Sequence, residues 1–126
     1  MVAENVSNIS QAVVIPAYAE KDMLFTTLAS LALNSPLSLE HSFVLCVINN
    51  KSNSSTEVKK NNQLTLKYLQ ALVQRKSLKH FNENRELINI LQLIADRKLR
   101  LGFIDASTVG YEIPDNEGGV GMARKI

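Results

Sequence analysis

Several residue types that would assign the chain to a class at once are scarce. Cysteine occurs once among the 126 residues, which excludes an internal disulfide. That residue, Cys46, lies in the apolar run FVLCVI, so we predict a buried structural thiol and not a nucleophile. The net charge of +2 is too small to argue for nucleic acid as a partner.

Long hydrophobic runs are also absent. No apolar stretch approaches the roughly 20 residues of a membrane span, so we expect no transmembrane segment. Residues 1–11 are polar and carry neither the basic flank nor the apolar run of a signal peptide. Together with the single cysteine, these absences favour a reducing compartment, and we expect the cytoplasm.

Glycine occurs only five times, and the glycine-rich phosphate motifs are missing. No Gly-x-Gly-x-x-Gly follows the first apolar run, and no Gly-x-x-x-x-Gly-Lys-Ser/Thr occurs, which argues against a dinucleotide loop and a P-loop. The Gly-x-Ser-x-Gly elbow of hydrolases is missing too. His41 and His80 have no second ligand at metal-binding spacing, so each is expected at a surface or a helix end.

What the chain does contain is an alternation of strand-like and helix-like segments. Short β-branched runs predict strands at residues 11–18, 42–50 and 99–107, and the first of these has the pattern of a fully buried strand. Apolar residues at helical spacing predict helices over residues 21–34, 55–75 and 84–97. Ser54 and Glu57 have the spacing of a capping box, which places the second helix start near Ser55.

This order predicts a parallel sheet with right-handed crossovers. We therefore expect one α/β domain over residues 1–126, with a Rossmann-like, three-layer parallel sheet. In such sheets, ligands bind outside the carboxyl ends of the strands. Residues 16–20, 49–55 and 105–107 follow the three predicted strands, so they should gather at one rim of the sheet.

Two polar stretches have a functional and a plain interpretation. Asn49 and Asn50 could pair with a nucleobase edge, but taken alone they are better explained as a turn. The glycines in GGVGMARK could let backbone amides approach an anion at a helix start, with Arg124 nearby. From spacing alone, a flexible loop with a helix cap is the simpler interpretation.

Taken together, three motifs resemble the inverting nucleotide-sugar glycosyltransferases of family two, which have an A-type glycosyltransferase fold. VVIPAYAE followed by LFTTLASL resembles their opening strand, Pro-x-Tyr-Asn-Glu turn and first helix. FVLCVINNKSNSS resembles their second strand and its polar turn, and GVGMARK resembles their later Gly-x-x-x-Ala-Arg-Asn helix. The motifs occur in the order of the family and span nearly the whole chain.

The resemblance implies that the chain binds a nucleoside-diphosphate sugar, whose sugar the parent enzyme transfers with inversion. The implied nucleotide-binding residues are Pro16, Ala17, Tyr18, Glu20, Asn49, Asn50 and Arg124.

The sequence also departs from the family pattern at three positions. Ala19 replaces a common Asn, the pair Asn49 and Asn50 replaces an Asp that contacts the base, and Lys125 replaces another Asn. These changes leave the base preference of the site open.

The Asp-x-Asp metal site and the catalytic carboxylate of the family would lie after the GVGMARK helix. The sequence contains neither, so we expect the N-terminal part of a longer glycosyltransferase, inactive by itself, whose full-length form uses Mg²⁺ or Mn²⁺. Asp105 precedes that helix and has no second acid beside it, so we interpret it as a rim residue.

Two other classes stay open: a nucleotidyltransferase-like nucleotide-binding domain, and a non-catalytic α/β interaction module. The first would normally show a glycine-rich basic loop after the first strand, which PAYAEKDM lacks. A last expectation concerns assembly. With strand order third, second, first, residues 12–15 form an uncharged edge strand, and we expect homo-oligomers through that edge.

Overall fold

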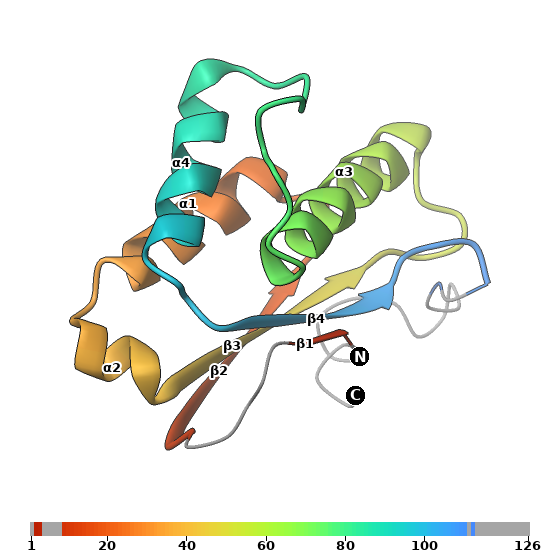
Figure 1. Ribbon diagram of the computed structural model, residues 1–126. Helices are drawn as coiled ribbons and strands as arrows, with labels where there is room; N and C mark the ends of the chain where they lie inside the picture. The colour runs from red at the N-terminus through yellow and green to blue at the C-terminus, as the bar shows by residue number, and fades with distance from the viewer. Residues whose placement is uncertain (1, 4–8, 111, 113–126) are drawn as a thin grey trace.

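The computed structural model describes residues 2–3, 9–110 and 112, and they form an α/β fold (Figure 1). In chain order the elements are β1 (Val2–Ala3), β2 (Gln11–Ala17), α1 (Lys21–Ala32), α2 (Pro36–Glu40), β3 (Ser42–Asn49), α3 (Thr56–Val73), α4 (Arg85–Asp96) and β4 (Leu101–Ala106). Each predicted strand and helix within the described residues is present. In this part of the chain, no helix is long and apolar enough to cross a membrane.

The sheet has the order β1-β4-β3-β2. Strands β2, β3 and β4 are parallel, and the two residues of β1 pair antiparallel to β4. The order of the three parallel strands agrees with the prediction. Strand β1 and the five-residue helix α2 were not predicted; α2 begins with Pro36, and the Ser35 side chain caps it by accepting the Ser38 N–H at 3.2 Å.

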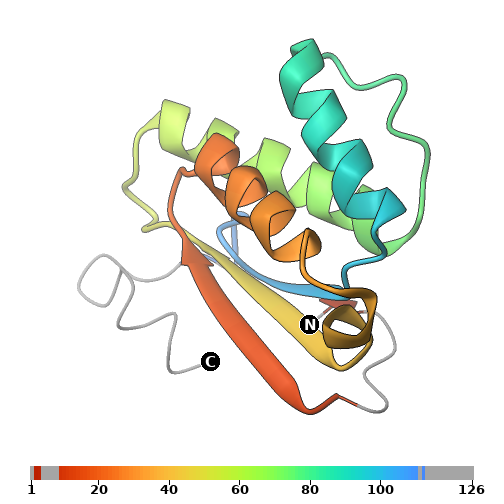
Figure 2. The ribbon, with the colours of Figure 1, turned by 90° about the vertical axis from the view of Figure 1, so that its left-hand side faces the viewer.

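Helices α1, α3 and α4 all lie on one face of the sheet, and α2 lies at the end of the sheet where β3 begins (Figures 1 and 2). The described residues thus form two layers, whereas three were expected. The core lies between these layers and includes Val44, Cys46 and Ile48 of β3. Cys46 is fully buried, as predicted, and burial raises the pKa of its thiol to about 12.

Among the described residues, strand β2 forms an open edge of the sheet, which Figure 2 shows in front of the other strands. The prediction that this strand is buried on both faces is wrong. The exposed fraction of Val14 is 53%, and that of Val13 is 38%. The β-branched run matched a buried strand, but within the described residues β2 pairs with β3 alone, and α1, α3 and α4 cover only one face of the sheet.

The outward direction of this edge follows from one hydrogen bond. The Gln11 N–H donates to the carbonyl oxygen of His41, next to β3, at 3.1 Å. Successive residues of a strand point their backbone N–H and C=O groups to opposite sides. The backbone groups of Ala12, Val14 and Pro16 therefore point away from β3, toward the open edge. Pro16 lacks an N–H, but an N–H at this position would not bond to β3, so no hydrogen bond of the sheet is lost. Proline takes this position in edge strands.

The helix ends differ slightly from the predicted capping. Ser55, not Ser54, caps α3 by accepting the Val58 N–H at 3.2 Å. Past the C-terminal ends of α3 and α4, Arg75 and Lys98 have positive φ angles of 57° and 58°. Glycine is the usual residue in that conformation after a helix.

Candidate functional site

The loops after β2, β3 and β4 meet at one rim of the sheet, as the sequence predicted. The strand register places Ala17 beside Ile48, and Asn49 beside Ala106. The Asn50 N–H also approaches the Ala106 carbonyl oxygen at 3.4 Å. We call this edge of the sheet the carboxyl rim.

Asn62 on α3 connects two of these loops from behind. Its side-chain Oδ1 accepts the Ala19 N–H at 3.0 Å. Its Nδ2 donates to the Asn49 carbonyl oxygen at 3.0 Å and to Asn50 Oδ1 at 2.9 Å. Only 1% of Asn62 is exposed, so these three hydrogen bonds compensate for burying its amide.

Asn49 and Asn50 lie under the rim surface, and both are 0% exposed. Asn49 Nδ2 donates to the Ala17 carbonyl oxygen at 3.1 Å. Asn50 Nδ2 donates to Lys51 O at 3.1 Å and to Glu112 Oε2 at 3.2 Å. In this arrangement the two amides hold the loops in place, while Asn49 Oδ1 is buried with no hydrogen-bond partner among the described residues.

Tyr18 and Glu20 form the exposed part of the rim. The exposed fraction of Tyr18 is 39%, and its hydroxyl lies 3.3 Å from Ser54 Oγ in the loop after β3. Glu20 Oε1 accepts the Tyr18 N–H at 3.4 Å. Between them, Ala19 has a φ of 52°, a conformation that costs an L-residue other than glycine, asparagine or aspartate roughly 1–2 kcal/mol.

Asp105 serves the loop after β4. Its Oδ1 accepts the backbone N–H groups of Ser107 and Thr108, each at 2.9 Å, and the Ser107 hydroxyl at 2.9 Å. The Thr108 hydroxyl bonds to Oδ2. Burial by itself would raise the pKa of Asp105, but these hydrogen bonds outweigh it and hold the pKa below its ordinary value. The carboxylate is thus committed to shaping its own loop.

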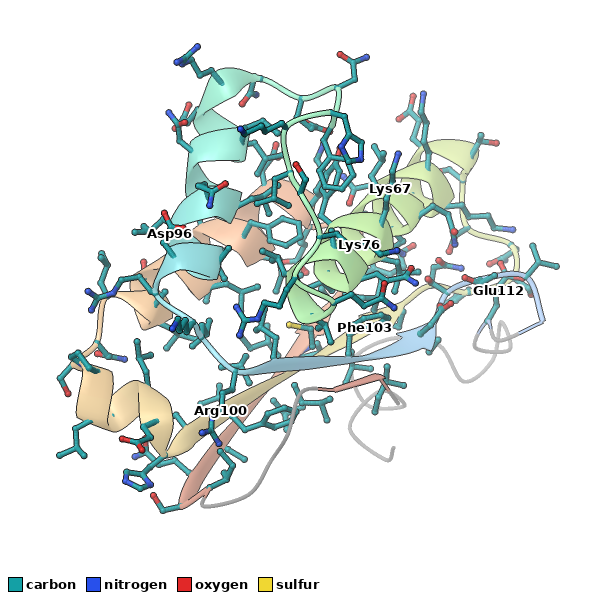
Figure 3. All side chains as sticks on the ribbon, in the orientation of Figure 1. Lys67, Lys76, Asp96, Arg100, Phe103 and Glu112 are labelled. Atoms are coloured by element: carbon teal, nitrogen blue, oxygen red, sulfur yellow. The ribbon has the colours of Figure 1, made fainter. Side chains whose placement is uncertain are left out.

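Two charged groups lie at the β3 side of the rim. Lys59 Nζ is 3.1 Å from Glu112 Oε2 and donates to the Ser52 carbonyl oxygen at 2.6 Å. Figure 3 shows Glu112 at this end of the sheet. Arg124 and the rest of the GVGMARK motif lie outside the described residues, so their predicted place near the nucleotide stays a prediction.

A second, partly buried polar cluster lies beside the rim. Glu83 Oε2 accepts from Lys21 Nζ at 2.9 Å and from the Tyr68 hydroxyl at 2.6 Å. Burial tends to raise the pKa of Glu83, but the bonds from Tyr68 and Lys21 prevail and lower it. Burial and the Glu83 contact raise the pKa of Tyr68. The cluster fastens the segment before α4 to the start of α1.

Neither Asn62 nor the Glu83 cluster was predicted from the sequence. Asn61 and Asn62 are adjacent, in the first half of a predicted helix, where asparagine is a poor helix former. Two poor helix formers within a helix indicate that their side chains serve contacts outside it. Asn61 Oδ1 accepts the Lys21 N–H at 3.1 Å, and Asn62 Oδ1 accepts the Ala19 N–H. Glu83 gave no such signal, since its partners are distant in the sequence.

The described residues include no group of three or more His, Cys, Asp or Glu side chains that could hold a metal ion. The rim carboxylates do not gather: Asp105 binds its own loop, and Glu112 pairs with Lys59. These residues therefore do not fit the divalent cation that the family resemblance implies for a full-length enzyme.

No protein-family model matches this chain, and neither a curated protein nor a solved structure is significantly similar to it. The resemblance to family-two glycosyltransferases therefore rests on the three sequence motifs alone.

Proposed function

We propose that the carboxyl rim binds the nucleotide of a nucleoside-diphosphate sugar, as the donor-binding part of a family-two-like inverting glycosyltransferase. The observation that carries the proposal is the Asn62 network, which orders the loops after β2 and β3 around the exposed Tyr18 ring. Parallel α/β sheets bind ligands at this end. The motif resemblance assigns the same loops to the nucleotide.

The local chemistry suggests a role for each predicted residue. The exposed ring of Tyr18 offers a face on which a base can stack, and the Glu20 carboxylate can accept hydrogen bonds from ribose hydroxyls. Pro16 and Ala17 bring the backbone to the rim. Asn49 and Asn50 act as positioning residues beneath this surface, because their amide N–H groups already donate to protein acceptors.

The proposed role is binding, not complete catalysis. Inverting sugar transfer requires a base that deprotonates the acceptor hydroxyl and a charge that stabilises the leaving diphosphate. Among the described carboxylates near the rim, hydrogen bonds engage Glu83 and Asp105 and lower their pKa, and Glu112 pairs with Lys59. The remaining one, Glu20, is assigned above to the ribose. We therefore expect this chain alone to release no nucleoside diphosphate from a nucleotide sugar, even with Mn²⁺.

Calorimetric titration with uridine diphosphate and guanosine diphosphate tests the binding role. We expect weak saturable binding of one of them, an unchanged affinity in Tyr18→Phe, and an affinity reduced by at least about fivefold in Tyr18→Ala. The loss of base stacking, worth about 1–3 kcal/mol, is the reason. Tyr18→Phe is the matched control because it keeps the ring and removes only the hydroxyl near Ser54.

The same titration separates the alternatives. A non-catalytic interaction module would show no saturable nucleotide site at millimolar concentration, and that result would refute the proposal. A nucleotidyltransferase-like domain would bind a nucleoside triphosphate more tightly than either diphosphate. Equal binding by Tyr18→Ala and the parent protein would also contradict the proposed rim site.

A further inference from the structure

A second site lies at the opposite end of the sheet from the carboxyl rim. A cavity of about 350 Å³ opens between α2 and the C-terminal ends of α3 and α4. Four of its lining residues are cationic: Arg75, Arg97, Lys98 and Arg100. Figure 3 shows Arg100 near α2, at the far end of the sheet from Glu112.

The charge of this cavity favours an anion. Among its described lining residues Glu40 is the only acidic one, so the formal charge of these residues is +3. Helix C-termini oppose an anion, but each contributes only about half a negative charge. The ends of α3 and α4 together thus offset about one unit, and a charge of about +2 remains.

Backbone geometry supports the same interpretation. Arg75 and Lys98 are both left-handed, at equivalent positions past two different helices. Glycine would take this conformation without strain and is common there. The chain instead has a long cation at both positions, and both line one cavity. Strained residues of this kind cluster at functional sites.

Hydrogen bonds within the protein hold one wall of the cavity in place. Arg97 Nε donates to the Ala32 carbonyl oxygen, and one terminal nitrogen donates to the Asn34 carbonyl oxygen, both at 2.8 Å. These bonds hold α4 against the end of α1. Pro36 and Leu39 add an apolar wall from α2. The cavity thus combines fixed positive charge with a small apolar surface.

We infer that this basic cavity is a binding site for a small phosphate monoester, separate from the rim. Its volume lies at the lower end of the range for small-molecule pockets, which suits a phosphate with a small organic part and not a larger cofactor. Guanidinium and ammonium groups bind phosphate through charge-assisted hydrogen bonds. The inference does not depend on the proposed nucleotide site.

Titration of the purified protein with ribose 5-phosphate, with ribose and inorganic phosphate as comparison ligands, tests this site. We expect saturable binding of ribose 5-phosphate, none of ribose, and weaker binding of inorganic phosphate. The double variant Arg75→Gly/Lys98→Gly should bind at least about tenfold more weakly, since it removes two of the positive charges that attract the phosphate. Its thermal stability should be preserved, because glycine relieves both left-handed residues.

Two further variants keep the result unambiguous. Lys60→Gln/Arg85→Gln removes two positive charges from exposed positions outside the cavity and should bind like the parent. Glu40→Gln removes the single carboxylate and should bind about fivefold more tightly, a gain that misfolding could not produce. The proposal is overturned if ribose 5-phosphate shows no saturable binding, or if both double variants weaken it equally. Inorganic phosphate that binds as tightly as ribose 5-phosphate would overturn the assignment to a monoester.

Discussion

Replacing Asn62 by alanine should destabilise the fold more than replacing Asn61, the other asparagine of α3. The substitution removes three hydrogen bonds, to Ala19, Asn49 and Asn50, in a side chain that is 1% exposed. A hydrogen bond contributes about 0.5–1.5 kcal/mol net, and buried partners left unpaired cost more. The expected loss is therefore about 3 kcal/mol, a large part of the roughly 5–15 kcal/mol of a typical domain.

Urea unfolding followed by circular dichroism measures this loss. With a slope of about 2 kcal/mol per molar, the unfolding midpoint of Asn62→Ala should fall by about 1.5 M while the slope stays constant. Asn61→Ala is the matched control, one residue earlier in the same helix. It removes a side-chain hydrogen bond in which Asn61 Oδ1 accepts the Lys21 N–H at 3.1 Å, at a partly exposed position.

The control should lose about 1 kcal/mol and shift the midpoint by about 0.5 M. If Asn62→Ala shifts the midpoint no further than Asn61→Ala does, the Asn62 hydrogen bonds do not hold the rim loops, and the basis of the nucleotide-site proposal fails. A change in slope would instead mean that the variant alters the unfolded ensemble or the two-state transition.

Four other outcomes are expected. Ala19→Gly should raise the free energy of unfolding by about 0.5–1 kcal/mol, because relief of the left-handed strain exceeds the entropy cost of glycine; a loss in urea unfolding would contradict this. Cys46, with its pKa raised to about 12 by burial, should react with a disulfide reagent at pH 8 only at the rate of global unfolding; faster labelling would mean local opening. Because folding lowers the pKa of Asp105, its contribution to stability should be complete above the ordinary pKa of 3.8 and lost as the pH falls through the lowered value. Asp105→Asn should therefore lose less stability on acidification, measured by denaturation between about pH 2 and pH 6. An unchanged pH dependence would assign the acid destabilisation to other groups. The parent should self-associate through β2 and Val14→Lys should not; sedimentation equilibrium that finds a parent monomer at about 100 micromolar would refute this.

Local patterns were sufficient for the main elements of the fold. The β-branched runs predicted β2, β3 and β4, and the apolar stripes predicted α1, α3 and α4. Strand β1 could not be predicted in this way, since two residues form a strand only through pairing with β4. Helix α2 was not predicted, because its five residues are too few to show an apolar period, although proline is common at the first position of a helix.

The candidate site was predictable in position but not in detail. Topology alone brings the loops after three parallel strands together, so Tyr18, Asn49 and Asp105 could be placed at one rim. Which of them faces solvent depends on tertiary contacts. The sequence favoured a turn for Asn50, with a base contact as the alternative, yet Asn62, twelve residues later, bonds to it beneath the surface.

The sheet is asymmetric in a way that limits how copies can assemble. Within the described residues, the seven residues of β2 form one edge of the sheet, whereas on the other side the two residues of β1 pair with Gly102 and Phe103 of β4. The outward N–H groups belong to Ala12 and Val14. An antiparallel pair centred on Val13 would therefore place each Ala12 opposite the Val14 of a second copy, and it would need no N–H from Pro16. In such a pair, the β2 edges of both copies are covered. Growth through β2 then closes at two molecules and does not continue into a filament.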